Sequence, residues 1–364
     1  MKSIPADQFQ HGDRAPRIDR RSFLVSGAAA AFSLMGAASF PRSAGAAQGG
    51  ARQDGTIYPL IDVHHHLFPP VLSRVLRNWW PSSAFPGVNR SLAEMNASHT
   101  TAAMISFPNP DITSFRESRL AELLRESNDY AMGLVRKYPN RYGLFASIPM
   151  PYVNGARAEI ARALDELHAD GILLLTSYNN KWLGDPSFEP VMRDLNDRHA
   201  VAFVHPTTSP CCRNLIPGIR DAVVEYETDT ARTIASIVFS GTAQRFPHIK
   251  FIFCHAGGTM PNLIERFTTA TLHDPALASR IPEGVIAYLR AFHYDTAQAA
   301  NQEALGDLLK IVPSEQVLFG TDFPWRKAPS QVRAIEAMNL PVSTVKGILG
   351  RNAQALIPRL RALG

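Results

Sequence analysis

Eight short hydrophobic runs recur along the chain, and segments with apolar residues at three- and four-residue spacing lie between most of them. Runs of this length predict buried strands, and the intervening spacing predicts amphipathic helices. Strands that alternate with helices favour right-handed βαβ units and a parallel sheet. The predicted strands are Leu60–Leu67, Thr101–Phe107, Arg141–Ile148, Gly171–Thr176, Val201–Pro206, Lys250–Ala256, Ala291–Thr296 and Val317–Pro324. The predicted helices are Ser114–Lys137, Gly155–His168, Phe188–His199, Thr228–Arg245, Pro261–Leu272 and Asn301–Ile311.

Four of the predicted strands end in a residue that can bind a metal ion. The first ends in three consecutive histidines, 64–66, the fifth in His205, the sixth in His255 and the eighth in Asp322. Only a closed sheet brings the carboxyl ends of its first and last strands together, so an open doubly wound sheet is disfavoured. We therefore predict an α/β fold, a (β/α)8 TIM barrel with a metal site; the family resemblance described below implies a barrel of the metal-dependent hydrolase type. Such barrels place their chemistry at the carboxyl-terminal rim.

The histidines of the first strand alternate in direction. His64 and His66 stand two residues apart and point to the same side, whereas His65 is expected to pack outward or to hydrogen-bond a neighbouring segment. Asp62 is expected on the inward face, where it either orients a histidine or pairs structurally. Together with the two histidines and the aspartate on other strand ends, this pair predicts a site for a divalent cation such as zinc, manganese or iron.

Further polar residues lie near the predicted strand ends. Asp295 ends the seventh strand, and a structural hydrogen bond is favoured for it over the orientation of a ligand. Cys254 alternates with His255 and is expected to face away from the metal. Cys211 and Cys212 follow the fifth strand, where turn packing and a role near the substrate both stay open. With three cysteines in the chain, no disulfide framework is predicted.

The longest predicted connection between a strand and a helix runs from Phe68 to about Ser98 and is rich in aromatic residues and proline. It contains Trp79-Trp80-Pro81 and Phe85-Pro86. Because it leaves the rim that carries the chemistry, we interpret it as an aromatic wall or lid beside a substrate, or as a structural cap over the barrel mouth.

Four motifs of the chain resemble those of a known family. IDVHHHLFPP, FVHP, HAGGTMPNLIERF and GTDFPW are similar to the aminocarboxymuconate-semialdehyde decarboxylase branch of the amidohydrolase superfamily. The segment VHPTTSPCC and the phrase YDTA are similar to its 6-methylsalicylate-decarboxylase-like members. The resemblance covers essentially all of the chain after its leader. The family pattern D-x-H-x-H falls on Asp62, His64 and His66.

The resemblance implies a role for each residue of the site. It assigns the metal to His64, His66, His205 and Asp322. It makes His255 catalytic, with either His255 or Asp322 delivering a proton. It also implies that Arg266, eleven residues beyond His255, reaches the site of a neighbouring subunit and holds a substrate carboxylate. No lysine follows the fourth strand, so one divalent ion per chain is expected, zinc or alternatively manganese, without an organic cofactor.

The implied activity is metal-dependent, non-oxidative decarboxylation of a small carboxylic acid, either aromatic, of the hydroxybenzoate or salicylate kind, or muconate-like. A hydrolase of an amide, a lactone or a β-dicarbonyl shares every motif and stays the alternative. Arg266, as a carboxylate clamp, favours decarboxylation over hydrolysis. A binding protein for a metal or small ligand is disfavoured by the additional histidine within reach of the site. A homodimer or higher homo-oligomer is expected.

The first 46 residues predict an export signal and not a part of the fold. Asp19-Arg20-Arg21-Ser22-Phe23-Leu24 is a twin-arginine pattern, followed by an Ala- and Gly-rich apolar run and the small-residue site Ala44-Gly45-Ala46. A cleaved signal, with export to the periplasm, is favoured over an uncleaved anchor because the run is only weakly hydrophobic. Residues 47–56 are interpreted as a linker and residues 57–364 as a single TIM-barrel catalytic domain.

Charge does not indicate a nucleic-acid partner. Six basic and three acidic side chains in residues 1–46 account for +3 of the formal charge of +5. The remainder is nearly neutral and has no basic stripe, so neither nucleic-acid binding nor stable membrane insertion is expected. A hydrophobic content of 45% suffices for the core of one barrel with insertions.

Overall fold

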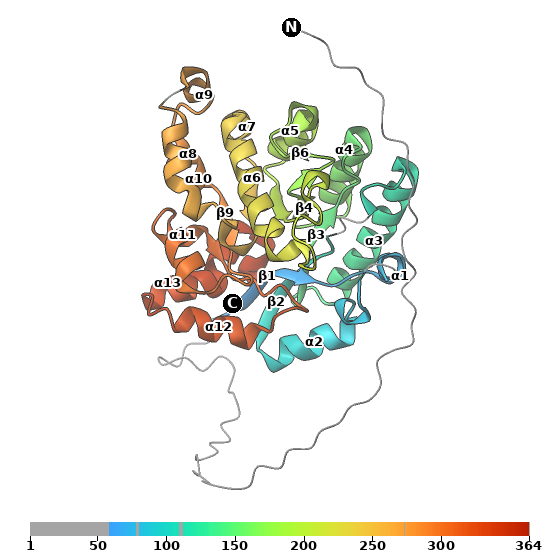
Figure 1. Ribbon diagram of the computed structural model, residues 1–364. Helices are drawn as coiled ribbons and strands as arrows, with labels where there is room; N and C mark the ends of the chain where they lie inside the picture. Colours follow the sequence, from blue (N-terminus) through green and yellow to red (C-terminus); the bar gives the residue numbers. More distant parts are fainter. Residues whose placement is uncertain (1–57, 78–79, 109–111, 273, 364) are drawn as a thin grey trace, which may run out of the picture. The chain divides into compact units, whose positions relative to one another are not determined.

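Eight parallel strands follow one another in chain order around the sheet of the computed structural model, with helices on the outside (Figure 1). The structure describes four stretches of the chain, residues 58–77, 80–108, 112–272 and 274–363. The predicted export signal and linker lie outside the described residues. The predicted (β/α)8 TIM barrel is confirmed.

The eight predicted strands are all present, most of them shorter than the hydrophobic runs. Their bounds are β1 Leu60–His66, β2 Thr100–Ser106, β3 Tyr142–Ser147, β4 Gly171–Leu175, β7 Val201–His205, β8 Lys250–Phe253, β9 His293–Asp295 and β10 Val317–Leu318. A separate antiparallel hairpin follows β4 and consists of β5 Ser177–Tyr178 and β6 Lys181–Trp182. Backbone hydrogen bonds close the barrel between its last and first strands, with Val63 N donating to Phe319 O at 2.9 Å and Asp322 N to His64 O at 2.9 Å.

The predicted helices are found, several of them divided or displaced. The α-helices are α1 Pro70–Leu76, α2 Val88–Ala97, α3 Glu117–Lys137, α4 Val153–Ala161, α5 Glu189–Asp197, α6 Glu225–Phe239, α7 Thr242–Arg245, α8 Ile264–Ala270, α9 Pro275–Arg280, α10 Val285–Ala291, α11 Asp307–Leu309, α12 Ala328–Glu336, α13 Val342–Lys346 and α14 Asn352–Leu356. The helix expected over Thr228–Arg245 is split into α6 and α7 because Gly241 has a φ of 75°, in the left-handed region.

The core has two layers. One lies between the strands and the surrounding helices; α3, for example, turns Leu120, Leu124 and Ala131 inward at helical spacing. The other fills the barrel itself and is made of inward residues such as Ile61, Phe203 and Ile252. The carboxyl-terminal segment joins this inner layer; its members there are Ala353, Ile357, Leu360 and Leu363. The barrel is therefore packed internally, and chemistry is confined to its ends.

A break in the register between β1 and β2 reverses the direction in which the last side chains of β1 point. Ile61 and Val63 belong to the apolar layer inside the barrel, and the pairing with β2 shifts between Asp62 and His65. Regular alternation from Val63 would leave His64 on the outer side of the sheet. The irregularity lets His64 and the residue two positions on project into the barrel mouth instead.

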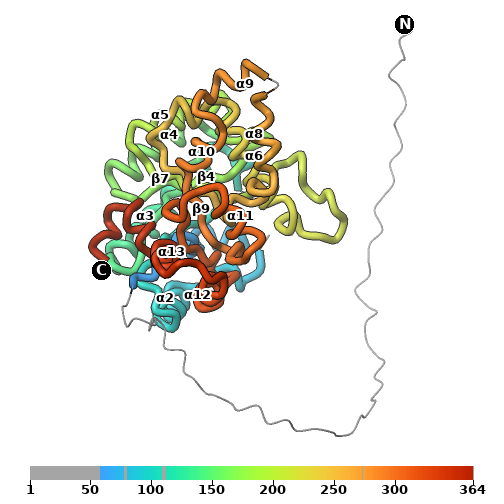
Figure 2. Tube along the Cα trace, turned by 90° about the vertical axis from the view of Figure 1, so that its left-hand side faces the viewer, coloured from blue at the N-terminus to red at the C-terminus, as the bar shows by residue number. Residues whose placement is uncertain are grey.

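A long connection between β7 and α6 projects from the body of the protein, where it is the yellow-green loop at the side of Figure 2. Its apolar side chains are exposed; the largest are Leu215, Ile216, Ile219, Val223 and Val224. No helix of the described residues is long and apolar enough to cross a membrane.

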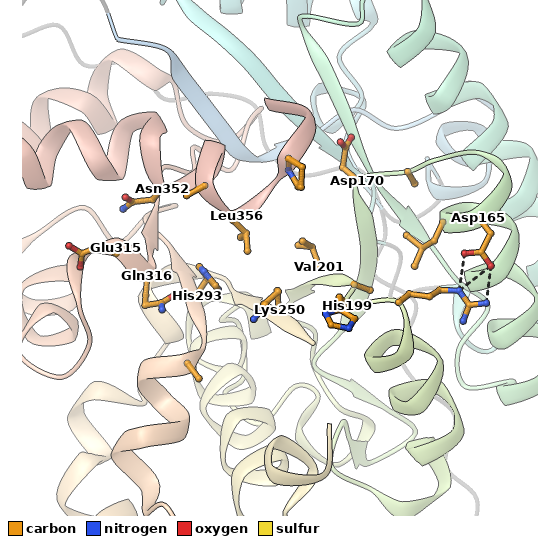
Figure 3. Close-up of a pocket in the computed structure, with 17 residues that line it drawn as sticks. Asp165, Asp170, His199, Val201, Lys250, His293, Glu315, Gln316, Asn352 and Leu356 are labelled. Atoms are coloured by element: carbon orange, nitrogen blue, oxygen red, sulfur yellow. Dashed lines mark hydrogen bonds and ion pairs between the residues drawn. The ribbon is translucent and has the colours of Figure 1, made fainter. Parts of the chain in front are cut away.

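A cavity of about 920 Å³ lies at the amino-terminal end of the barrel (Figure 3). The first residues of two strands, Val201 and Lys250, line it, together with His293 and residues of α14. It lies opposite the end where the metal-binding residues gather, because those residues follow the carboxyl ends of the strands.

Candidate metal centre

Four residues from three places in the chain meet at the carboxyl-terminal mouth of the barrel. His64 and His66 end β1, His205 ends β7, and Asp322 follows β10. One ligand atom from each of these residues lies within 4.8 Å of the ligand atoms of the other three. The Nε2 atoms of His64 and His66 are 3.1 Å apart, and Asp322 Oδ1 lies 3.0 Å from His66 Nε2. The sequence predicted this convergence from the strand ends alone.

Each of the three imidazoles is held through its Nδ1 atom. His64 Nδ1 donates to Asp295 Oδ2 at 2.8 Å, and His205 Nδ1 to the carbonyl oxygen of Pro206 at 2.8 Å. His66 Nδ1 lies 3.0 Å from the Ser106 hydroxyl. Partners behind Nδ1 fix the orientation of the ring and leave Nε2 for the centre of the cluster.

Burial and charge give His66, His205 and Asp322 the protonation states that a cation needs, and His64 is the exception. Burial lowers the pKa of His66, and burial together with the neighbouring imidazoles lowers the pKa of His205, so both rings are neutral and have a free lone pair. Burial would raise the pKa of Asp322, but His64 and His66 outweigh it and hold that pKa well below its usual range. Burial would lower the pKa of His64, whereas Cys254, Asp295 and Asp322 raise it above its ordinary value.

The residues at the centre are almost completely enclosed, and nearly all of the small remaining exposure belongs to three of them. His64 and His66 have relative exposures of 0% and 1%, whereas His205, His255 and Asp322 have 6%, 5% and 4%. A small molecule would therefore approach from the side of the latter three residues. Three imidazole nitrogens and one carboxylate oxygen suit a borderline divalent ion such as zinc or manganese.

Two residues of the site adopt a backbone conformation that side chains other than glycine seldom take. His255 has a φ of 55° and Asp322 a φ of 63°. Asp322 is fixed by its amide, which donates to His64 O at 2.9 Å, and by Gln298 Nε2, which donates to its carboxylate. Strained backbone of this kind is maintained where the surroundings determine it and is common at functional sites.

His255 lies beside the four-residue cluster without belonging to it. Its ring is stacked on His64, with ring centroids 5.3 Å apart, and its Nε2 atom is 4.0 Å from Asp322 Oδ2. Both ring nitrogens are buried, and neither has a hydrogen bond of regular geometry among the described residues. On the other side of the ring, Nδ1 lies 3.0 Å from Glu227 Oε1. Burial would lower the pKa of His255, but the Glu227 carboxylate outweighs it and the pKa is raised.

The start of α6 supplies residues that the sequence did not reveal. Besides Glu227, it contributes Asp229, which is buried and accepts hydrogen bonds from the Thr176 and Ser177 hydroxyls and from Trp182 Nε1. Acidic residues are common near the start of helices, so the sequence has no feature that distinguishes these two. Gly258 allows the approach: a side chain there would meet the Glu227 carbonyl oxygen at 2.2 Å.

Asp62 and Cys254 differ from expectation. The Asp62 carboxylate contacts the ring of His65 and no ring of the cluster, with Oδ2 3.2 Å from His65 Nδ1. It also accepts the backbone amide of His64 at 3.1 Å and the amide and hydroxyl of Thr321. Cys254 does not face away: its sulfur forms a close group with His64 and Asp295, because it continues the inward face of β8. After Cys254 the chain enters a left-handed turn, and His255 is part of that turn and not of the strand.

Asp295 and His65 complete the support of β1. The sequence favoured a structural hydrogen bond for Asp295, yet one carboxylate oxygen contacts His64, while the other accepts the amides of His255 and Ala297. His65 turns away from the cluster as expected, with Nε2 2.8 Å from the Ser91 hydroxyl. Thr176 and Ser177, at the end of β4 where a second metal would need a lysine, are both bound to Asp229.

Arg266 is not brought to the site of its own chain. It lies in α8, is exposed, and has no ion-pair partner within the described part of the chain. The structure of one subunit therefore leaves this guanidinium free for a ligand or a partner molecule. The role in a neighbouring site stays a prediction.

The fold and the site are those of a metal-dependent barrel enzyme, and comparison with known proteins agrees. The chain matches the amidohydrolase family over residues 61–359 and belongs to it. The protein named decarboxylase yanB of Aspergillus niger is 32% identical over 324 residues, which are 83% of this chain and 88% of that protein. The 6-methylsalicylic acid decarboxylase of Penicillium expansum is 31% identical over 316 residues, 83% of this chain and 97% of that one.

A solved structure supports the fold independently. The crystal structure of a dihydroxybenzoic acid decarboxylase from a Polaromonas species, with bound manganese and the inhibitor 2-nitroresorcinol, superimposes with a TM-score of 0.73. It is 20% identical in sequence, and the match covers 83% of this chain and 97% of that one. The family model and the curated relatives confirm the family that the sequence motifs resemble.

Proposed function

We propose that this protein is a metal-dependent, non-oxidative decarboxylase of an aromatic carboxylic acid of the hydroxybenzoate or salicylate kind. The observation that carries the proposal is the placement of His255, a buried histidine with an unpartnered Nε2 atom beside a four-residue cation site. A metal-dependent decarboxylation uses a cation site and a proton donor close together, and the curated relatives at 31–32% identity are decarboxylases.

We assign the ion to His64, His66, His205 and Asp322, one per chain. The donor set supports zinc, and manganese is the alternative, since it is bound in the Polaromonas structure. When bound, the ion would supply a Lewis acid for the carboxylate and an adjacent oxygen of the substrate. Thr176 and Ser177 lie at the end of β4, where a second ion would need a lysine, and both hydroxyls donate to Asp229. This arrangement supports a single ion.

His255 is assigned as the proton donor. In the reaction the bond between the ring carbon and the carboxylate carbon breaks, carbon dioxide leaves, and the ring carbon takes a proton. Glu227, 3.0 Å from Nδ1, stabilises the protonated imidazole and leaves Nε2 on the side of Asp322 for delivery of the proton. Asp322 then serves the cation, with Gln298 holding its second oxygen.

An aromatic cluster beside the site supports an aromatic substrate. Phe68 packs between His66 and Trp80, with ring centroids at 6.2 Å and 5.5 Å, and Trp80 continues to Phe85 and to the partly exposed Trp325. Trp325 is tied to the site because its amide donates to the carbonyl of Asp322 at 2.8 Å. Such rings bind a planar ring by stacking, with an energy of about 0.5–1.5 kcal/mol for each pair beyond burial.

Three further parts of the proposal rest on the sequence. Arg266 would bind the substrate carboxylate in the site of a partner subunit, which requires a homodimer or a higher homo-oligomer. Residues 1–46 would direct export through the twin-arginine route, with cleavage after Ala44-Gly45-Ala46 and a periplasmic location. Export of the folded protein would suit an enzyme that acquires its ion before it leaves the cytoplasm.

The proposal is tested by metal analysis and turnover together. Purified protein is analysed for zinc and manganese, and a panel of hydroxybenzoates and methylsalicylates is then assayed for release of carbon dioxide. Benzamides and lactones of similar size serve as the comparison panel. Release of carbon dioxide from at least one acid, without hydrolysis of the comparison panel, is expected. Hydrolysis without decarboxylation would replace the proposal by the hydrolase alternative.

A further inference from the structure

Cys211 and Cys212 form a pair of thiols outside the metal centre and have no role in the proposed reaction. They lie in a short helical turn, Pro210–Cys212, at the base of the projecting connection between β7 and α6. Their sulfur atoms are 2.7 Å apart, with Cys211 exposed and Cys212 buried. The third cysteine of the chain, Cys254, is buried inside the barrel and belongs to a different part of the fold.

The turn that carries the pair is held in place by Asn180. Its side-chain oxygen accepts the Cys211 amide at 2.8 Å and the Ser209 hydroxyl at 2.9 Å. Thr207, earlier in the same connection, donates its amide to the Thr176 hydroxyl at 3.0 Å. The two thiols are therefore presented together by an ordered turn, with one sulfur open to solvent and the other directly behind it.

We propose that Cys211 and Cys212 are a reversible oxidation site, at which a small-molecule disulfide such as oxidised glutathione converts the vicinal dithiol into a vicinal disulfide. The exposed Cys211 thiolate attacks one sulfur of the oxidant, forms a mixed disulfide and releases one thiolate. The Cys212 thiol then loses its proton and attacks the Cys211 sulfur, releasing the second thiolate. The two cysteines lose two protons and two electrons in total, and the oxidant is reduced to two thiols.

The order of attack follows from exposure and from the ease with which each thiol ionises. Burial and the contact with Cys211 raise the pKa of Cys212 to about 11, so Cys212 is the poorer first nucleophile. Solvent access leaves Cys211 as the sulfur that an oxidant meets first. Once the mixed disulfide exists, the proximity of Cys212 makes the second step intramolecular and fast compared with capture of another oxidant molecule.

Reversibility follows from the covalent geometry of neighbouring residues. Adjacent Cα atoms are fixed about 3.8 Å apart by a trans peptide. Most disulfides join Cα atoms roughly 4.4–6.8 Å apart, and departures from that range make the bond easier to reduce. Strained and exposed disulfides are the labile ones. The pair is thus suited to respond to the surrounding thiol–disulfide balance and unsuited to a permanent cross-link.

Peptide mapping tests the proposal without any activity assay. The full protein is equilibrated with mixtures of oxidised and reduced glutathione, quenched in acid, unfolded, alkylated and digested with trypsin. Cleavage after Arg198 and Arg213 places both thiols in the peptide 199–213, and Cys254 falls in the separate peptide 251–266. In the oxidising mixture the first peptide should escape alkylation and be lighter by two hydrogens, and excess reduced glutathione should restore both alkylation sites.

Matched variants separate an internal disulfide from simple glutathione addition. In Cys211→Ser the peptide should never show the loss of two hydrogens. Phenylarsine oxide, which needs two neighbouring thiols, should bind the wild-type protein one to one and bind neither Cys211→Ser nor Cys212→Ser. A wild-type peptide that stays fully alkylated in the oxidising mixture, or that carries glutathione in place of the internal bond, would overturn the proposal. Equal arsenical binding by the wild type and both variants would overturn it as well.

Discussion

The Glu227 carboxylate lies 3.0 Å from Nδ1 of His255, although the two residues are on different elements, at the start of α6 and after β8. The contact stabilises the protonated form of a buried histidine against the effect of burial. It also orients the ring so that Nε2 faces the cation site. The pair combines the acid that the proposed reaction needs with the charge that keeps it protonated.

Replacement of Glu227 tests this relationship. In Glu227→Gln the pKa of His255 should fall, because burial then acts without the opposing carboxylate. The proton donor is active while His255 is protonated, and activity is lost as pH rises through the pKa of His255. A lower pKa in the variant should therefore move the alkaline limb of the rate profile to lower pH. The measurement is kcat against pH. Glu225→Gln, in the same helical turn, is the control and should leave the profile in place.

Metal content and turnover should separate at His64 and His255. His64→Ala should abolish both, because it removes one of the four cation ligands. His255→Ala should keep its metal and lose turnover by about 10²–10⁴-fold, the contribution typical of a positioned proton donor. His65→Ala, with a side chain that turns to Ser91, should keep its metal. Metal analysis of the three purified variants decides, and equal metal loss in His64→Ala and His255→Ala would make His255 a ligand.

Asp295 should control how tightly the ion is held. Its carboxylate accepts the hydrogen bond of His64 Nδ1 at 2.8 Å, on the side of the ring away from the cation site. In Asp295→Asn the ring keeps a hydrogen-bond partner, but the negative charge of that partner is gone. Substitution of such a partner typically weakens metal affinity by about 10–100-fold. Competition with a chromophoric chelator measures the change. Asp229→Asn removes another buried carboxylate that touches no residue of the cluster and should lower thermal stability without changing metal affinity.

The strand ends could be predicted because their cause is local. A strand that is buried on both faces must be apolar, so a histidine or aspartate at its end stands out, and closure of the barrel then requires these ends to meet. His64, His205 and Asp322 are placed in this way. Nothing in this reasoning depends on which helix covers which strand.

The partners behind the site could not be predicted for the opposite reason. Glu227 contacts His255 because the start of α6 lies next to the left-handed turn that follows β8. Neither the position of that helix start nor the left-handed turn can be predicted from a local sequence pattern. Cys254 was misplaced because strict alternation assumes a strand that continues, whereas β8 ends at Phe253. Asp62 was misplaced by the break in register within β1.

Acid should destabilise the fold through His293, at the opposite end of the barrel from the cation site (Figure 3). Burial and the nearby Lys250 lower the pKa of this histidine to about 4. The unfolded chain binds the proton near pH 6.5 and the folded chain only near pH 4, so stability should fall between these values by about 3 kcal/mol and then level off.

Urea unfolding at a series of pH values measures this loss. His293→Gln should remove most of it, since glutamine keeps a polar side chain without a proton to gain. Lys250→Met should reduce it, because one cause of the lowered pKa is gone. A wild-type stability that is constant between pH 4 and pH 6.5, once the carboxylates are accounted for, would contradict the assignment.

Arg266 should act in the site of a partner subunit. It is exposed on α8 and has no ion-pair partner within the described part of its own chain, and a guanidinium binds both oxygens of a carboxylate at once. Arg266→Lys keeps the charge but loses this geometry, so KM for the acid should rise while metal content is unchanged. Arg280→Ala, an exposed arginine on the neighbouring α9, should have no effect.

Mixed subunits give the decisive measurement. Arg266→Ala and His255→Ala are each expected to be nearly inactive, but if the site is shared, a dimer containing one of each has one complete site, with the intact Arg266 of one chain and the intact His255 of the other. Activity should return in proportion to the fraction of mixed dimers, which differently tagged subunits allow to be purified. Purified mixed dimers without activity would place Arg266 in the site of its own chain or outside the reaction. Their activity would establish that the enzyme needs two subunits to build each site.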